Sequence, residues 1–403
     1  GAGHNGLTNA AYLAKSGLKV LVVEKNDYIG GASVSRVLHE GWTYSNCSYV
    51  CSLLRPEIFR DLNLQKYGLQ VLPYGGSVTF MQNGDIFGGY SDDDLARREI
   101  GRFSKRDADA YVRFARDVSR QCRFIKPMLL RTPPDPTSFK PKDLGELIYL
   151  FKRLYSLGEQ TIYDTIRFYT MSVAEYLDEY FESDVIKAAL SGSGIIGTGL
   201  GPYSPGTAYV LLHHYMGEVD GSIGSWGFAR GGMGSIANAL ADAFKDYDGE
   251  LLTDAEVSQI IVKRGRAKGV VLSNGDEYYA KNIVSNLDVK RTYQKLFDPK
   301  DLSEKILKQV DAFKIRGSSG KLNIALDGIP EFPALGKNNP LICSDMHFID
   351  STERIERAYD DWKNGRWSRD PYADVLIPTM TDPTMSPPGK HYMSVFVQYA
   401  PAK

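Results

Sequence analysis

Three glycines at the start of the chain have the spacing of a loop that binds a diphosphate. Gly1, Gly3 and Gly6 form the pattern G-x-G-x-x-G. In such a loop the first glycine permits a tight turn, the second lets the backbone approach a pyrophosphate, and the third lets a helix pack closely on a strand. A helix that begins here also directs free N–H groups and its positive dipole end at the phosphates. This spacing therefore indicates binding of a dinucleotide.

An acidic residue follows at the place where such a site needs one. Residues 7–16 carry apolar and small side chains at helical spacing, and Gly17 is typical of a helix C-terminus. Residues 18–23 are almost continuously aliphatic, which predicts a buried parallel strand. Glu24 ends this strand, where a carboxylate accepts hydrogen bonds from ribose hydroxyls and repels a 2′-phosphate. The pattern predicts a Rossmann-type βαβ unit and disfavours NADP.

A second glycine pair, Gly30 and Gly31, comes shortly after Glu24. Glycines allow the backbone to approach a ligand again, because no Cβ stands in the way. Flavoproteins often use this second approach, since the extended FAD molecule continues beyond its pyrophosphate. The glycine pair therefore favours FAD as the cofactor.

Residues 1–35 resemble the N-terminal part of the FAD-dependent oxidoreductases of the phytoene desaturase and flavin amine oxidase superfamily. Similar segments recur along essentially the whole chain, at residues 45–64, 204–217, 224–244 and 382–401. The resemblance implies that the backbone of Val257 brackets the adenine. It also implies that the stretch with Ser285 and Asn286 returns the chain towards the dinucleotide. On spacing alone, the strands around Val257 predict only a three-stranded meander.

The resemblance implies an α/β fold with a Rossmann-like FAD-binding domain of the glutathione-reductase type. A second, α+β substrate domain carries a helical subdomain. We expect the FAD-binding domain at residues 1–70 and 223–300, and the substrate domain at residues 71–222, with a helical lid, and 301–403. Superfamily members begin with a strand before the glycine motif and continue further, so we expect this chain to lack that strand and a C-terminal part.

Two elements of the substrate domain can be predicted from local patterns. Asn83-Gly84, between alternating apolar residues, predicts a hairpin within residues 71–90. Apolar residues recur at helical spacing over 144–155, after a proline-rich connector. We expect this stripe to be the core face of a helical subdomain. A lid over an apolar substrate and a face that lies on a membrane are the alternatives.

No group of side chains predicts the catalytic residues, because a flavin carries the redox chemistry and hydride removal needs no acid–base pair at fixed spacing. His213 and His214 are adjacent and face different ways, so we expect structural roles. The six histidines show no metal-ligand spacing, and no metal is expected. Cys47 and Cys51 do not form a C-x-x-C pair, which argues against disulfide reduction.

Composition narrows the function further. The 403 residues have a net charge of −1, whereas nucleic-acid-binding proteins usually carry a basic excess, so no nucleic acid is expected. Four cysteines suit a reducing compartment, the cytoplasm of a bacterium or the mitochondrial matrix of a eukaryote. Nothing in the sequence indicates the oligomeric state.

The function that we expect is that of an FAD-dependent dehydrogenase or desaturase. Its substrate would be an apolar, polyene- or lipid-like small molecule, and peripheral contact with a membrane would suit such a substrate. Two alternatives stay open, because a fold does not fix a function. One is a flavin amine oxidase. The other is a flavin-fold protein that escorts a hydrophobic partner without turnover.

Overall fold

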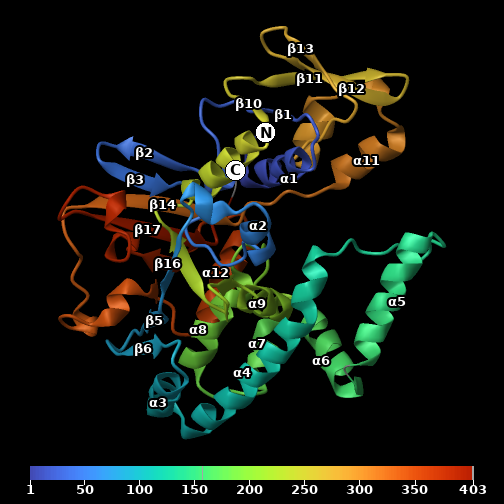
Figure 1. The fold of residues 1–403 in the computed structure, drawn as a ribbon. Coiled ribbons are helices and arrows are strands. Elements are labelled where there is room, and N and C mark those ends of the chain that lie inside the picture. Colours follow the sequence, from blue (N-terminus) through green and yellow to red (C-terminus); the bar gives the residue numbers. More distant parts are fainter. Residues whose placement is uncertain (157, 402–403) are drawn as a thin grey trace.

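The computed structural model describes residues 1–156 and 158–401, which form three regions (Figure 1). One region surrounds the N-terminal helix, the second is a six-stranded sheet, and the third is a group of helices. Among the described residues, no helix is both long enough and apolar enough to cross a bilayer.

The first region is built around two closely packed helices, α1 and α10. Leu7 and Ala11 of α1 and Leu240 and Phe244 of α10 are fully buried in one cluster. Strand β1 pairs in parallel with β10. The helices of this region are α1 (His4–Lys15), α2 (Pro56–Asp61), α10 (Gly234–Asp246) and α11 (Glu304–Ala312). Its strands are β1 (Leu21–Val23), β2 (Ser35–His39), β3 (Trp42–Ser45), β10 (Glu250–Leu252), β11 (Val257–Lys263), β12 (Arg266–Leu272) and β13 (Glu277–Tyr279).

Helix α1, its end at Gly17 and the three-stranded meander of β11, β12 and β13 are as predicted from the sequence, but the first strand is shorter than predicted. Gly17 has φ +81°, and the N–H of Leu18 donates to Leu13 O at 3.2 Å, so residues 17 and 18 serve to end α1. Strand β1 therefore begins only at Leu21. Leu18 is 55% exposed, so the prediction of a buried strand from residue 18 is wrong for its first part.

The second region is a sheet with the order β14-β17-β16-β15-β5-β6. All neighbours are antiparallel except the parallel pair β15 and β5. Phe80 faces Ile86 across the Asn83-Gly84 turn, as predicted for the hairpin. The strands are β5 (Ser77–Phe80), β6 (Ile86–Gly89), β14 (Ser319–Leu326), β15 (Asp345–His347), β16 (Tyr372–Leu376) and β17 (His391–Gln398).

The central strands of this sheet bury side chains on both faces, but only one face is apolar. Val78, Met346 and Val375 lie in a buried apolar cluster on one face. The alternate residues, among them Thr79, His347 and Asp374, are buried on the other face. Strands β15 and β16 pair His347 with Asp374, and β15 and β5 pair His347 with Thr79. Burying polar groups costs free energy unless they form hydrogen bonds, so we expect this polar face to have a functional role.

The third region is a helical group around Phe114, Phe168, Leu177 and Leu211, all of which are buried. Its helices are α3 (Asp93–Phe103), α4 (Lys105–Ile125), α5 (Pro141–Tyr155), α6 (Gly158–Thr170), α7 (Val173–Asp178), α8 (Asp184–Ile195) and α9 (Thr207–Tyr215). Helix α12 (Thr352–Lys363) packs between α8 and the sheet. A short ribbon of β4 (Val71–Tyr74) and β9 (Trp226–Ala229) lies near the two predicted domain boundaries, which stay predictions. The hairpin of β7 (Glu218–Val219) and β8 (Ser222–Ile223) precedes β9.

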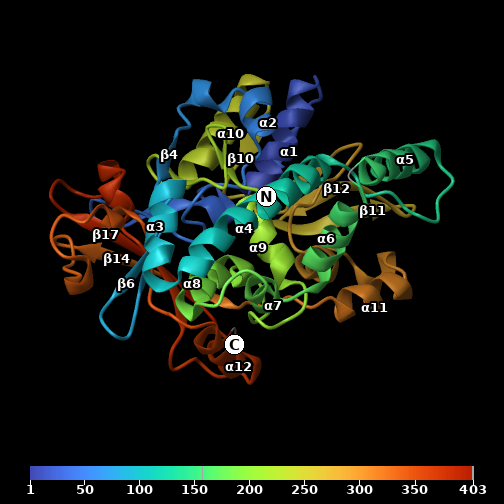
Figure 2. The same cartoon turned by 90° about the horizontal axis from the view of Figure 1, so that it is seen from below.

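Helix α5 corrects one prediction. No residue of α5 is buried, and Phe151 and Tyr155 are 68% and 79% exposed. Arg153 donates to Phe124 O at 3.2 Å, which attaches α5 to the end of α4. In Figures 1 and 2 the helix extends to one side of the molecule. The prediction of a core face is therefore wrong, because helical periodicity shows that a stripe exists but not that anything covers it.

Candidate functional site

The predicted glycines meet in a tight loop at the start of α1. Gly3 and Gly30 form an isolated parallel bridge. A Cβ on Gly31 would lie 2.9 Å from the Cα of Gly3, and a Cβ on Gly6 would collide with the carbonyl oxygen of Gly1. The first N–H groups of a helix have no intrahelical acceptor. The five glycines therefore form a cradle that excludes side chains and leaves backbone donors for a ligand.

Glu24 is held at the edge of this cradle by both of its carboxylate oxygens. Oε2 accepts a hydrogen bond from Ala2 N at 2.8 Å, and Oε1 accepts from Asn26 N at 3.1 Å and from Asn26 Nδ2 at 2.9 Å. The backbone carbonyl of Glu24 accepts from Ala255 N at 2.8 Å, so the start of β11 with Val257 lies beside it. Oε1 already accepts two hydrogen bonds, whereas Oε2 accepts one and keeps a further lone pair with which to accept a ribose hydroxyl.

Asn286 reaches the cradle through its side chain, but Ser285 does not. A Cβ on Gly1 would lie 2.8 Å from Asn286 Oδ1, and a Cβ on Gly6 would lie 2.7 Å from Asn286 Nδ2. The hydroxyl of Ser285 is instead 2.8 Å from Thr292 Oγ1. Six of the nine predicted residues thus lie together at one loop, Glu24 and Val257 lie beside its edge, and the side chain of Ser285 contacts Thr292 instead of the loop.

A half-buried lysine lies where the first region meets the sheet. Lys321 Nζ, from β14, donates to Ser45 O at 2.9 Å and to Asn323 Oδ1 at 3.1 Å. The ammonium is 5.1 Å from the centre of the Tyr49 ring. Burial lowers the pKa of Lys321 to about 8. The side chain can therefore exchange a proton near neutral pH, which an ordinary lysine does not.

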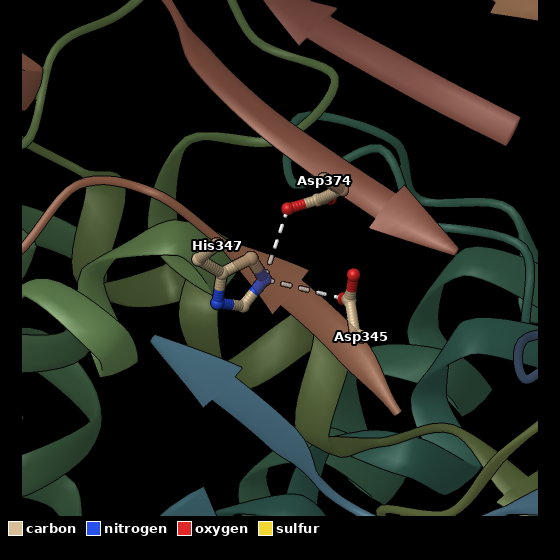
Figure 3. Close-up of side chains that lie close together, drawn as sticks. All are labelled: Asp345, His347 and Asp374. Atoms are coloured by element: carbon tan, nitrogen blue, oxygen red, sulfur yellow. Dashed lines mark ion pairs between the residues drawn. The ribbon is translucent and has the colours of Figure 1, made fainter. Parts of the chain in front are cut away.

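A histidine stands between two carboxylates on the polar face of the sheet (Figure 3). His347 Nε2 is 3.0 Å from Asp374 Oδ1 and 3.3 Å from Asp345 Oδ2. Tyr49 OH donates to Asp374 Oδ2 at 3.0 Å. Burial by itself would lower the pKa of His347, but the two carboxylates raise it to about 10. Burial raises the pKa of Asp345 to about 6, and the charge of Asp374 adds to that shift. The cluster strongly favours a cation between its carboxylates.

This cluster was not predicted from the sequence. Asp345 and His347 are two residues apart, a spacing that puts both on one face of a strand, and this was a usable signal. Asp374 could not be found in the same way. Its position opposite His347 depends on the register of β15 and β16, and local spacing does not give that register.

The contacts of His214 and of Cys51 indicate structural roles rather than chemistry. His214 Nδ1 lies 2.9 Å from Val210 O, and its ring stacks on Trp226. Cys51 is buried, and burial raises the pKa of its thiol to about 11. Because thiol exchange requires a thiolate, this shift disfavours disulfide chemistry at Cys47 and Cys51.

The cradle fits the ADP part of a dinucleotide. It offers backbone donors at the start of α1, and the buried His4 Nδ1 beside it has no hydrogen-bond partner among the described residues. Glu24 is placed to accept hydroxyl groups and to disfavour a 2′-phosphate. Together with the second, sheet-containing region, the site defines the class of two-part FAD-dependent oxidoreductases.

Comparison with known proteins gives the family. The family model described as "Flavin containing amine oxidoreductase" matches residues 6–402. The chain therefore belongs to the flavin-containing amine oxidoreductase family, and FAD is its cofactor. A solved oxidoreductase structure from Methanosarcina mazei has the same fold, with a TM-score of 0.62 at 17% identity over 100% of this chain and 78% of that chain.

Three curated relatives differ in how closely they resemble the chain. Mouse pyridine nucleotide-disulfide oxidoreductase domain-containing protein 2 is 33% identical over 100% of this chain and 73% of its own length. Prolycopene isomerase from Daucus carota is 28% identical over 98% of this chain and 60% of its own length. The neurosporene-forming phytoene desaturase of Rhodobacter capsulatus is 27% identical over 96% of this chain and 69% of its own length. The chain thus also resembles the polyene-related branch named in the sequence analysis.

Proposed function

We propose that the protein is an FAD-dependent dehydrogenase or desaturase that acts on an apolar, polyene- or lipid-like substrate. The observation that carries this proposal is the apolar face that α5 and α6 leave open to solvent. Its side chains are 41–79% exposed: Leu144, Ile148, Phe151, Tyr155, Tyr163, Ile166 and Tyr169. An exposed apolar patch of this kind usually marks a site of interaction with an apolar partner or membrane. The names of the carrot and Rhodobacter relatives agree with this substrate class.

The roles of the residues follow from their places. The redox chemistry, removal of a hydride from the substrate, would be supplied by bound FAD. The glycine cradle would hold its pyrophosphate, and Glu24 would hold its ribose. Lys321 would exchange a proton at Nζ where the two regions meet, since its pKa of about 8 permits both forms. The protein need only bind the substrate, orient it beside the flavin and exclude water, so a conventional acid–base pair is not required.

We further propose that α5 and α6 contact an anionic membrane surface. A cavity of about 780 Å³ lies along α3 and α4 and reaches the C-terminal end of α5 at Arg153, and five arginines line it together with a single carboxylate: Arg97, Arg116, Arg120, Arg123, Arg153 and Asp93. Basic residues near exposed apolar side chains suit a surface of anionic lipids. The positive charges attract the protein to the lipid headgroups, and the apolar side chains insert between the lipids. Such a position would bring the protein to the phase in which an apolar substrate dissolves.

The substrate class can be tested by anaerobic reduction of the flavin. The complete FAD-loaded protein is mixed with a polyene hydrocarbon in detergent micelles, or with a primary amine, and the flavin absorbance is followed. The proposal predicts bleaching by the polyene and none by the amine. Bleaching by the amine alone would overturn it in favour of amine oxidation.

A further inference from the structure

The contacts of His347 with its two carboxylates do not have the geometry of hydrogen bonds. Although Nε2 lies 3.0 Å and 3.3 Å from the two oxygens, neither Nε2 nor Asp374 Oδ1 has a hydrogen-bond partner among the described residues. The ring N–H direction therefore misses both carboxylates, although one ligand atom of each of the three residues lies within 4.8 Å of the others. Ligand atoms about 2.0 to 2.2 Å from a metal are themselves separated by about 3.0 to 3.4 Å. The observed separations are those of neighbouring metal ligands.

Other polar groups on the same buried face as the cluster also lack hydrogen-bond partners among the described residues. Asp374 is 1% exposed and His347 is 7% exposed, so water does not solvate their charges. On the same face, Thr79 Oγ1 and Tyr372 OH are fully or almost fully buried and have no hydrogen-bond partner among residues 1–156 and 158–401. Thr79 is paired with His347 in the sheet, and Tyr372 precedes Asp374 by two residues. Buried polar groups without partners mark a place where a ligand belongs.

Charge decides which kind of ligand fits. Two carboxylates with a protonated histidine carry a net charge of −1, which is costly in a buried site. A divalent cation with a neutral imidazole brings the same cluster to zero. All three ligand atoms lie within 4.8 Å of one another, close enough for one small ion to contact them together.

We propose that Asp345, His347 and Asp374 form a binding site for one divalent transition-metal ion, with Zn²⁺ as the representative ion. An imidazole nitrogen with two carboxylate oxygens suits zinc and its neighbours better than magnesium or calcium, which take oxygen ligands alone. Three protein ligands leave a coordination position for water or another oxygen donor. Tyr49, which donates to Asp374 Oδ2, orients one ligand from outside the metal. The proposal does not depend on the substrate class proposed above.

The test uses the complete, flavin-loaded protein. The protein is treated with a chelator, exchanged into metal-free buffer and titrated with Zn²⁺, and bound zinc is measured by mass spectrometry. The expected result is one Zn²⁺ per chain. The variants Asp374→Asn and His347→Gln should bind at least about a hundredfold more weakly, because each removes a ligand. Tyr49→Phe, which keeps all three ligands, should weaken binding by about tenfold.

A matched control separates a lost ligand from a destabilised fold. Asp107 is also fully buried, and its carboxylate accepts hydrogen bonds from Glu182 N and Ser183 N, away from the cluster. Asp107→Asn should lower the melting temperature and still bind one Zn²⁺. Should Asp374→Asn fail to fold, Asp345→Asn replaces it, because the side chain of Asp345 is 19% exposed.

Three results would overturn the proposal. The first is that the unmodified protein binds no more zinc than Asp374→Asn or Asp345→Asn. The second is that zinc binding survives in His347→Gln, or that X-ray absorption at the zinc edge reports sulfur ligands. The third is that an organic diamine such as putrescine binds to the chelator-treated protein in proportion to these carboxylates while Zn²⁺ does not.

Discussion

At the scale of single residues, Glu24 links the glycine loop to the expected ribose position. Its carboxylate accepts hydrogen bonds from Ala2 N and from Asn26, so it fixes the loop and keeps one lone pair, on Oε2, for a ligand. Glu24→Gln should weaken FAD binding by about 1.5 to 3 kcal/mol, the scale of a hydrogen bond to a charged group. The FAD dissociation constant, measured by flavin fluorescence, checks this. Glu250→Gln, an exposed change on the neighbouring strand, is the control. Equal affinity in both variants would place the ribose partner elsewhere.

Lys321 gives a pH-dependent prediction. Burial disfavours its charged form and lowers its pKa to about 8, so its reactivity towards an acylating reagent should rise around pH 8. Between about pH 8 and 10.5 the unfolded chain keeps a proton that the folded chain has lost, so this group's contribution to the unfolding free energy increases with pH. Competitive acetylation followed by peptide mass spectrometry measures the titration. The exposed Lys19 is the reference, and the same pH dependence at both residues would contradict the account.

The residues of the cofactor cradle could be predicted from the sequence, whereas the cluster of Asp345, His347 and Asp374 could be predicted only in part, through the spacing of its first two residues. The glycines and Glu24 act through local geometry, in which spacing along the chain sets spacing in space. The cluster joins two strands, and its geometry depends on a sheet register that pairs His347 with Asp374. The resemblance to a superfamily supplied Asn286, whose contact with the cradle comes from a distant segment.

At the scale of elements, the face formed by α5 and α6 gives the clearest prediction. Phe151 is 68% exposed, so Phe151→Glu should leave the fold and the bound flavin unchanged. If this face inserts into a membrane, the loss of one apolar side chain costs about 1.5 to 3 kcal/mol, or at least about tenfold in binding. Co-sedimentation with vesicles containing anionic phosphatidylserine measures it. Val37→Glu, on β2 and 64% exposed, is the control. Vesicle binding that is unchanged in Phe151→Glu would contradict the membrane contact.

Element types were easier to predict than the faces that the elements bury. The alternation of Leu322, Ile324 and Leu326 is typical of a strand, and these residues lie in β14, yet Leu322 and Ile324 are 50% and 38% exposed. The polar side of this strand, with Lys321 and Asn323, is the one that faces the first region and the neighbouring strand. Helix α5 shows the same effect. Periodicity identifies two sides of an element, and only the assembled fold determines which side is covered.

At the scale of the whole molecule, several contacts join the cofactor region to the sheet. Trp42 Nε1 donates to His391 O at 3.0 Å, Lys321 donates to Ser45 O, and Tyr49 donates to Asp374. Gly231 N, from the segment before α10, donates to the buried Asp382 at 2.6 Å. FAD binding should therefore stabilise both regions together, since a ligand that binds only the folded state raises its stability.

The central claim is that this fold is built to hold FAD, and the visible spectrum of the purified complete protein tests it most directly. We expect a yellow protein with the absorption spectrum of an oxidised flavin. Denaturation of this protein should release FAD rather than FMN or NADP. We also expect that removing the FAD lowers the melting temperature and that adding FAD restores it. A colourless protein that neither takes up FAD nor melts at a higher temperature in its presence would contradict the account.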